Sequence, residues 1–279
     1  MKTTKKINKM IALMVMLMFG GAMMAQEVND SVKLEKRDTT RISWGKSKII
    51  IIAGEDDEED SKDTSKSEKK QRYNHFAGLD LGVNGFLNPD MGTNLQKDAE
   101  FLDLNYGKSI SFAWNFYEKY IPIAKEKFGI MTGMGIEVNN YDLDRDVDIV
   151  TNGDTTFGIV STTKSISKNR LKTTMINVPL MLETNIGKDA KHSFHLAAGA
   201  LFSYRLGSKT KQKYSEDGKD YKVKNRNDFN MNPFRASLAA RVGYGQFTLF
   251  ANYSITEMFE DNDGPEIYPF TVGISLAAF

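Results

Sequence analysis

Cysteine is absent from this 279-residue chain. The sequence therefore has no disulfide framework, no thiolate metal site, no cysteine nucleophile and no lipid-modified cysteine after a signal sequence. A dominant charge is lacking as well, because 37 basic side chains are matched by 36 acidic ones, which leaves a formal net charge of +1. No overall field attracts nucleic acid or an anionic surface, and we expect no nucleic-acid partner.

Long apolar runs are also lacking. From residue 76 onward no stretch approaches the roughly 18 consecutive apolar residues of a membrane-spanning helix. The unbroken run at residues 10–19 is too short to span a bilayer, and it follows Lys2, Lys5, Lys6 and Lys9. The small residues Gly20, Gly21, Ala22 and Ala25 come next. This layout is typical of a secretory signal peptide, and we predict one at residues 1–25, with cleavage after Ala25.

The next segment, residues 26–72, is charged and irregular. Residues 55–60 are six consecutive acids, which repel one another and bury nothing. We therefore predict a periplasmic linker that ends at residue 72, followed by a folded domain at residues 73–279. An apolar island at residues 49–53 has two possible interpretations. It is either one short strand, docked on a barrel rim or on another protein's sheet edge, or an apolar segment of a disordered tail.

Apolar and non-apolar residues alternate repeatedly in the rest of the chain. Ile110, Phe112, Trp114 and Phe116, for example, are separated by alanine, serine and asparagine. A period of two is the pattern of a β-strand with two different faces. The pattern predicts eight strands, at residues 77–83, 109–116, 128–139, 176–183, 194–205, 234–244, 247–255 and 268–276.

The second face of these strands distinguishes a membrane barrel from a soluble sheet. A soluble sheet would present lysine and glutamate to water, whereas here the second face is mostly glycine, serine, alanine, threonine and asparagine. Small residues suit the narrow lumen of a barrel with eight strands. The connections are alternately long and short, as in barrels with one end outside the cell. The sequence therefore predicts an all-β protein, an eight-stranded antiparallel transmembrane up-and-down β-barrel with extended extracellular hairpins, located in the cell outer membrane.

Two of the long connections carry turn signals. Asn152-Gly153 and Asp217-Gly218 each lie between apolar or aromatic residues, and both dipeptides favour tight two-residue turns. We predict that the third to sixth strands continue beyond the membrane as ribbons. The edges of such ribbons can pair with another chain.

Motifs in four predicted strands carry a family resemblance. They are the glycine-rich third strand, Asn177-Val178-Pro179-Leu180-Met181-Leu182 in the fourth, Ala198-Gly199-Ala200 in the fifth, and a last strand that ends in Phe279. With these motifs, residues 73–279 resemble the small outer-membrane barrels called PorT-like or the outer-membrane protein β-barrel domain family. The motifs are degenerate and specify the family rather than a function. One feature departs from such barrels: the apolar face of the last strand has even residue numbers and Phe279 is odd, so that a bulge near Ala277 and Ala278 would be needed to restore the phase.

Six charged residues occupy inward-facing positions. Because strand direction reverses at each connection, the position of a residue along its strand indicates its depth in the barrel. Three are expected towards the exterior, namely Glu137, Arg205 and Arg235. The other three, Asp80, Glu183 and Arg241, are expected towards the periplasm. An isolated charge in so narrow a lumen would be poorly solvated, so we predict two layers of opposite charges that plug the barrel. The alternative is a path for protons or solutes.

Candidate catalytic and metal-binding residues are few. The three histidines, His75, His192 and His195, are expected at the periplasmic rim, whereas a surface lipid hydrolase needs its base at the outer leaflet. Ser193 shares the inward face with His195, but the sequence shows no third group to orient them. Asp142, Asp144, Asp146 and Asp148 form either an acidic hairpin arm or a calcium site. We predict no catalytic residue, no cofactor and no bound metal.

These observations predict a non-enzymatic outer-membrane barrel that is structural or contacts proteins through its extracellular ribbons or periplasmic tail. A narrow channel for small solutes and a lipid-modifying enzyme are the alternatives. The expected partners are outer-membrane lipid, the barrel insertion machinery, and another surface or periplasmic protein.

Overall fold

The structure is a computed structural model that describes residues 39–44, 47–52, 75–124, 127–161, 164–187, 193–216 and 218–277. Internal contacts divide the chain into two compact units, Met1–Lys66 and Ser67–Phe279. The signal peptide and the domain boundary at residue 72, both predicted from the sequence, lie outside the described residues.

The first unit contains an antiparallel hairpin. Its strands are β1 (Thr39–Trp44) and β2 (Ser47–Ile52), and Ile42 lies opposite Ile49. Two threonines and one isoleucine lie in β1 and four isoleucines in β2, and β-branched residues favour extended backbone. The apolar island therefore pairs with the residues just before it, a third possibility beside the lone strand and the unstructured segment.

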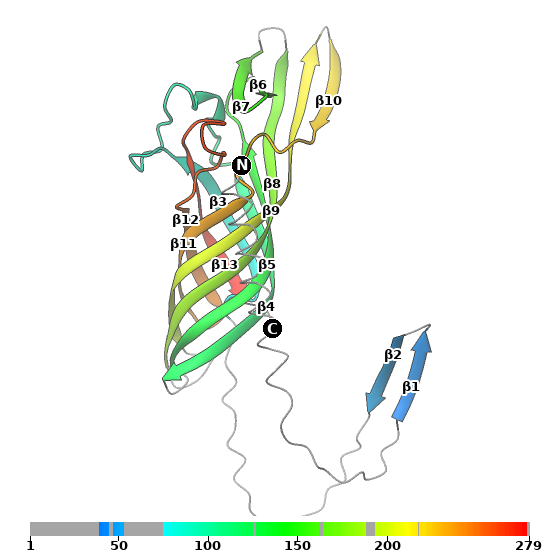
Figure 1. Ribbon diagram of the computed structural model, residues 1–279, viewed down its shortest axis with the longest axis vertical. Coiled ribbons are helices and arrows are strands. Elements are labelled where there is room, and N and C mark those ends of the chain that lie inside the picture. The colour runs from blue at the N-terminus through cyan, green and yellow to red at the C-terminus, as the bar shows by residue number, and fades with distance from the viewer. Residues whose placement is uncertain are drawn as a thin grey trace, which may run out of the picture. The chain divides into compact units, whose positions relative to one another are not determined.

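Eight strands of the second unit close into a barrel (Figure 1). Each strand pairs antiparallel with its neighbours, and the pairing of β13 with β3 joins the first strand to the last. The barrel strands are β3 (Gly78–Leu87), β4 (Ile110–Ala124), β5 (Phe128–Asp142), β8 (Ser165–Ile186), β9 (Phe194–Glu216), β11 (Phe234–Tyr244), β12 (Phe247–Ser254) and β13 (Tyr268–Ala277). This architecture confirms the predicted up-and-down barrel.

The two faces of the barrel strands differ as the alternation predicts. In β3, Leu79 and Leu81 are 48% and 52% exposed, whereas Asp80 between them is 5% exposed. The outward side chains are mainly leucine, valine, isoleucine and aromatic residues, which a bilayer covers. The inward side chains include buried serine, threonine and asparagine. The barrel is thus apolar outside and largely polar inside.

A β-bulge in β4 explains why this strand is longer than predicted. Up to Phe116 the outward side chains have even numbers, and from Tyr117 onward they have odd numbers. The extra residue exchanges the two faces, so the alternation breaks at that point. The predicted strand therefore stopped at Phe116, whereas β4 continues to Ala124 and forms a tight hairpin with β5.

The connections are short at one end of the barrel and long at the other. At the short end, Gly245 and Gln246 join β11 to β12, and Gly245 has the left-handed φ of 58° that a tight turn needs. At the long end, β6 (Val147–Asn152) pairs with β7 (Thr155–Val160), and β10 (Lys219–Asn225) pairs with the outer part of β9. Both predicted hairpins are confirmed. The loop of the first hairpin is Gly153-Asp154, one residue later than predicted, because Asn152 still pairs with Thr155.

The long connections pack into a folded body, here called the extracellular head, which comprises residues 88–109, 143–161, 164–172, 207–216, 218–233 and 255–267. Its elements include η1 (Glu100–Leu102) and the two outer hairpins. The head has its own apolar core, which also takes in the outer ends of β3 and β5. The largest fully buried side chains of this core are Phe86, Leu102, Tyr141, Leu171, Phe229, Met231, Phe259 and Ile267.

No helix in the described ranges is long and apolar enough to cross a membrane. In β13 the outward residues Val272, Ile274 and Leu276 keep their even numbers. Ala278 and Phe279, where a bulge would restore the phase, lie outside the described residues.

Candidate functional site

The first charged pair of the lumen joins β5 to β11. Glu137 is 4% exposed, and its Oε1 lies 2.6 Å from Nη2 of Arg235. The amide nitrogen of Asn177 donates to Glu137 Oε2 over 2.7 Å, and the side chain of Asn139 donates to Oε1. The buried carboxylate therefore has both a countercharge and hydrogen-bond donors, which a charge needs in a place with little water.

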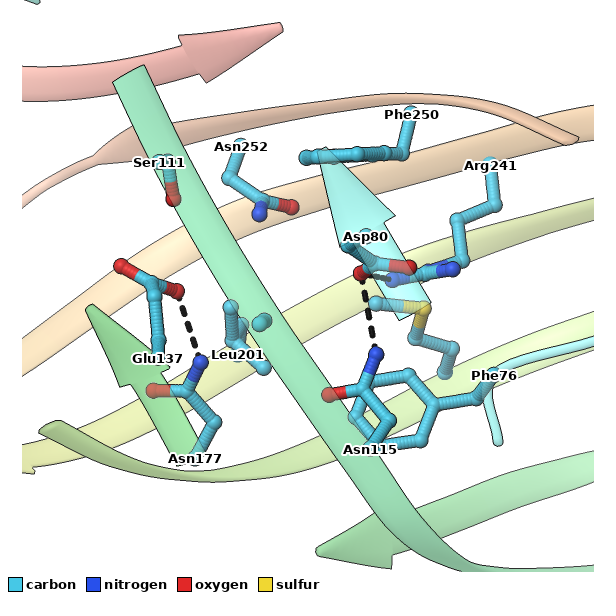
Figure 2. Close-up of a pocket in the computed structure, with 12 residues that line it drawn as sticks. Phe76, Asp80, Ser111, Asn115, Glu137, Asn177, Leu201, Arg241, Phe250 and Asn252 are labelled. Carbon is cyan, nitrogen blue, oxygen red and sulfur yellow. Dashed lines mark hydrogen bonds and ion pairs between the residues drawn. The ribbon is translucent and has the colours of Figure 1, made fainter. Parts of the chain in front are cut away.

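A second pair lies nearer the short-loop end of the barrel, because Arg241 is closer than Arg235 to the turn between β11 and β12. Figure 2 shows this pair together with Asn115. Arg241 on β11 pairs with Asp80 on β3, and Asn115 donates to the same carboxylate over 3.0 Å. The guanidinium of Arg241 lies 5.0 Å from the ring centre of Phe76 and 5.3 Å from that of Phe250. A cation near two aromatic rings gains cation–π attraction, so Arg241 is held by one anion and two rings.

Two buried histidines extend this network. Nδ1 of His75 lies 2.8 Å from Oε1 of Glu183, and Nε2 of His195 lies 2.8 Å from the hydroxyl of Thr248. The two imidazole rings stack with their centres 3.7 Å apart. Both histidines are buried, at 3% and 0% exposure, and His195 lies opposite Gly243, close to the turn between β11 and β12. The pair therefore lies inside the lumen near its short-loop end. His192 lies outside the described residues.

The sequence predicted two layers of lumen charges, and the structure gives the partner of each charge. Asp80, Glu183 and Arg241 were expected to form one layer. Glu183 and Arg241 both lie opposite Ala197 in the register, and within this layer Arg241 pairs with Asp80 while Glu183 contacts His75. His75 comes from the segment before the first strand and is a member of this network that the sequence did not predict.

Arg205 was expected in a layer with Glu137 and Arg235. In the register, Met175 lies between Glu137 and Arg205. Nη2 of Arg205 donates instead to the carbonyl of Met231 over 2.8 Å, and so it binds the extracellular head.

Residues 75–77 enter the lumen, a feature that the alternation pattern missed. Their side chains are all buried. The backbone amides of Phe76 and Ala77 donate to Oε2 of Glu118 over 2.6 and 2.9 Å. A Cβ at Gly133 would lie 2.8 Å from the ring of Phe76, so only glycine leaves room for this ring. The glycines of the third strand were the available signal, because they leave space that another segment must fill.

Apolar side chains complete the filling of the lumen. Met131, Met181, Ala197, Leu201 and Ala239 are buried and pack together with Phe76. The cavity between these residues and the charged pairs measures about 10 Å³, which is about the space of one water molecule. The arrangement suits a structural plug and leaves little room for a solute.

The acidic segment of the head pairs with cations. Arg170 Nη2 lies 2.8 Å from Asp142 Oδ2, and Lys164 Nζ lies 3.0 Å from Asp148 Oδ2. The hydrogen bond to Asp148 raises the pKa of Lys164. Within the part of the chain that the structure describes, no three histidine, aspartate or glutamate side chains form a group that could hold a metal ion. Asp142 and Asp148 thus each pair with a basic side chain.

Comparison with known proteins gives a family and distant structural neighbours. Two crystal structures of Ail, the attachment invasion locus protein of Yersinia pestis, are similar to this chain at 9% identity. One covers 72% of this chain and 99% of Ail with a TM-score of 0.29. The other, in complex with the heparin analogue sucrose octasulfate, covers 72% of this chain and 96% of Ail with a TM-score of 0.28.

A search of curated proteins found no match. A family model described as outer membrane protein beta-barrel domain matches residues 62–260, which locates the protein in the cell outer membrane. The chain thus belongs to the outer membrane protein beta-barrel domain family.

Proposed function

We propose that this protein is a non-enzymatic barrel that binds another protein through its extracellular head. The observation that carries the proposal is the apolar core of the head, in which Leu102, Phe259 and Ile267 are at most 2% exposed. A barrel that only spans a membrane needs only short connections. Long connections that fold into an ordered body are usually functional, because ordering them costs conformational entropy.

The head presents apolar side chains on its outside. On β7, Phe157, Ile159 and Val160 are 37%, 49% and 66% exposed, and on β10, Tyr221 and Val223 are 42% and 44% exposed. Among the described strands, β10 pairs with β9 alone, so its other edge is an edge of the sheet. Apolar side chains beside an open strand edge form a surface that an extended segment of another protein can join.

The contents of the lumen support this function over the two alternatives. A solute channel needs a continuous opening, whereas the ion pairs and the segment at residues 75–77 fill the barrel. A lipid-modifying enzyme needs its base at the outer leaflet, whereas His75 and His195 contact Glu183 and Thr248 inside the lumen.

Within the family, we assign the chain to the PorT-like barrels. The two sequence motifs that carry this resemblance pair with each other across β8 and β9, with Met181 opposite Gly199. A Cβ at Gly199 would lie 2.3 Å from the carbonyl oxygen of Leu180, so this motif requires glycine where the two strands meet. Motifs in the barrel wall support the subfamily and do not specify the partner of the head.

Photo-crosslinking in intact cells tests the proposal. A photoreactive phenylalanine analogue at position 157 should give a discrete covalent adduct with one protein. The matched control replaces Phe202, which is 46% exposed on the lipid-facing surface, and should give no such adduct. Absence of an adduct at position 157, or the same adduct at both positions, would contradict the proposal. Steady conductance of the purified protein in planar bilayers would favour the channel instead.

A further inference from the structure

The outward face of β9 changes from apolar to basic where the strand leaves the barrel wall. Below this point Phe202 and Tyr204 face outward, at 46% and 45% exposure. A β-bulge at Leu206 then exchanges the faces, because Met175 pairs with Arg205 and Thr174 pairs with Gly207. The outward positions beyond the bulge are therefore odd-numbered, and residues 209, 211 and 213 are all lysines.

The neighbouring strands add cations on the same face. Residues that pair directly across strands share a face, and Lys211 pairs with Arg170 on one side and with Lys224 on the other. Lys213 pairs in the same way with Lys168 and Lys222. The resulting surface, here called the basic face, consists of Lys168, Arg170, Lys172, Lys209, Lys211, Lys213, Lys222, Lys224 and Arg226.

The basic face has little countercharge of its own. Among the described residues, its ion pairs are limited to that of Arg170 with Asp142. The nearby charge of Lys222, followed by burial and by three further lysines, lowers the pKa of Lys211. Burial, followed by the charges of Lys209 and Arg170, lowers the pKa of Lys172. Like charges placed this close repel one another, and a bound polyanion would relieve the repulsion.

The lowest part of the basic face is an open groove of about 330 Å³. Lys172, Lys209 and Arg226 line it together with Leu206, whose side chain is 56% exposed. Just below, Tyr204 pairs with Phe234 and their ring centres lie 5.0 Å apart. Exposed aromatic side chains of this kind mark the membrane interface of a barrel. The groove therefore stands at the height of the lipid headgroups and combines an apolar rim with three cations.

We propose that this groove binds the phosphate groups of an anionic lipid of the outer leaflet, and that the rest of the basic face extends over the neighbouring headgroups. A soluble polyanion would find cations here but would have no use for Leu206 and the adjoining apolar wall. A lipid uses both, because its acyl chains lie against the barrel while its phosphates reach the lysines. This inference is independent of the protein-binding role proposed for the head.

Native mass spectrometry of the full chain in detergent tests the site, with diphosphoryl lipid A as the probe. Each basic residue near a membrane surface contributes about fivefold to binding of anionic lipid. The variant Lys172→Gln/Lys209→Gln/Arg226→Gln should therefore lose on the order of 100-fold in affinity. The control Lys97→Gln/Lys108→Gln/Lys219→Gln removes the same charge from exposed positions off the basic face and should bind as the unmutated protein does. Lipid A without its phosphates should not bind.

Three results would overturn the proposal. They are equal losses in the two triple variants, equal binding of the dephosphorylated lipid, and binding of heparin, a soluble polyanion, without any binding of lipid A. Folding of each variant is checked by the shift in electrophoretic mobility on heating that folded barrels show. If the first triple variant does not fold, Lys209→Gln alone should lose about fivefold, and unchanged affinity in that variant would also overturn the proposal.

Discussion

The lumen of this barrel buries paired charges beside its apolar side chains, whereas the core of the extracellular head is an apolar cluster. In the lumen, Glu137 and Asp80 are buried against Arg235 and Arg241. In the head, the most buried positions are apolar, as at Leu102 and Ile267, which have no exposed surface. Both regions are closely packed, so the difference lies in what surrounds each of them.

The surroundings explain why the lumen buries ion pairs and the head buries apolar side chains. The barrel wall is stabilised by lipid on its outside and by backbone hydrogen bonds along its strands, so its narrow interior needs only to be filled and neutral. The head lies in water, where loops order only if apolar burial offsets the entropy that they lose. The lumen therefore tolerates charge in pairs, and the head requires an apolar core.

The largest expected effect comes from breaking one lumen pair. In Arg241→Met, Asp80 stays buried without its cation, and removing one partner of a buried ion pair costs about 3–5 kcal/mol. The double variant Asp80→Asn/Arg241→Met should lose less than Arg241→Met alone, because it leaves no uncompensated charge. Urea unfolding of the barrel in detergent micelles measures both free energies. Additive losses would mean that the two residues are not energetically coupled.

A smaller effect is expected from placing a charge on the lipid side of the same wall. Leu180 is 38% exposed on the middle of the outward face of β8, so Leu180→Arg should cost about 2–4 kcal/mol in a bilayer. The same substitution at the exposed head residue Asn152 should change stability by less than about 0.5 kcal/mol. Unfolding from lipid vesicles compares the two variants. Equal costs would show that the outward face of β8 is not the lipid face.

The strands of the barrel could be predicted from the sequence because each strand has one face in lipid and one in the lumen. Alternation follows directly from that geometry, as at Leu79, Asp80 and Leu81. It failed where a bulge exchanged the faces, after Phe116, because a period of two cannot show an inserted residue.

The lumen charges could be placed by depth, but their partners could not be predicted. His75, the partner of Glu183, lies outside every alternating segment, so the alternation could not reveal this contact. The core of the head was not visible at all. Phe229 and Phe259 come from irregular connections, and residues in such segments come together only through tertiary packing that has no sequence period.

A milder change in the head core should act on the head alone. Ile267 has no exposed surface, and Ile267→Val removes one buried methylene, which costs about 0.5–1.5 kcal/mol. We expect faster hydrogen exchange at the amides of residues 255–267 and unchanged exchange in the barrel strands. Exchange that rises equally in β3 and β13 would mean that the head and the barrel open as one cooperative unit.

The smallest expected effect concerns a carboxylate at the base of the head. Burial, followed by the nearby charges of Glu266 and Asp261, raises the pKa of Glu257. A raised pKa in the folded protein means that the ionised form is disfavoured there, so Glu257 lowers stability at pH values above its folded pKa. The loss disappears as the pH falls below about 4.3, the usual pKa of glutamate in an unfolded chain, because the carboxyl is then protonated in both states.

Glu257→Gln should therefore stabilise the head at pH 7 by less than about 1 kcal/mol, since Glu257 is partly exposed and water screens its repulsion. The gain should vanish at pH 4 or below. Hydrogen exchange of residues 255–267 at the two pH values measures it, after correction for the intrinsic pH dependence of exchange. Asp90→Asn, which removes the same charge from an exposed loop of the head, serves as the control. A gain in stability that persists at low pH would mean that side-chain packing, and not charge, causes the effect. The base of the head would then be stabilised by packing, as its core is.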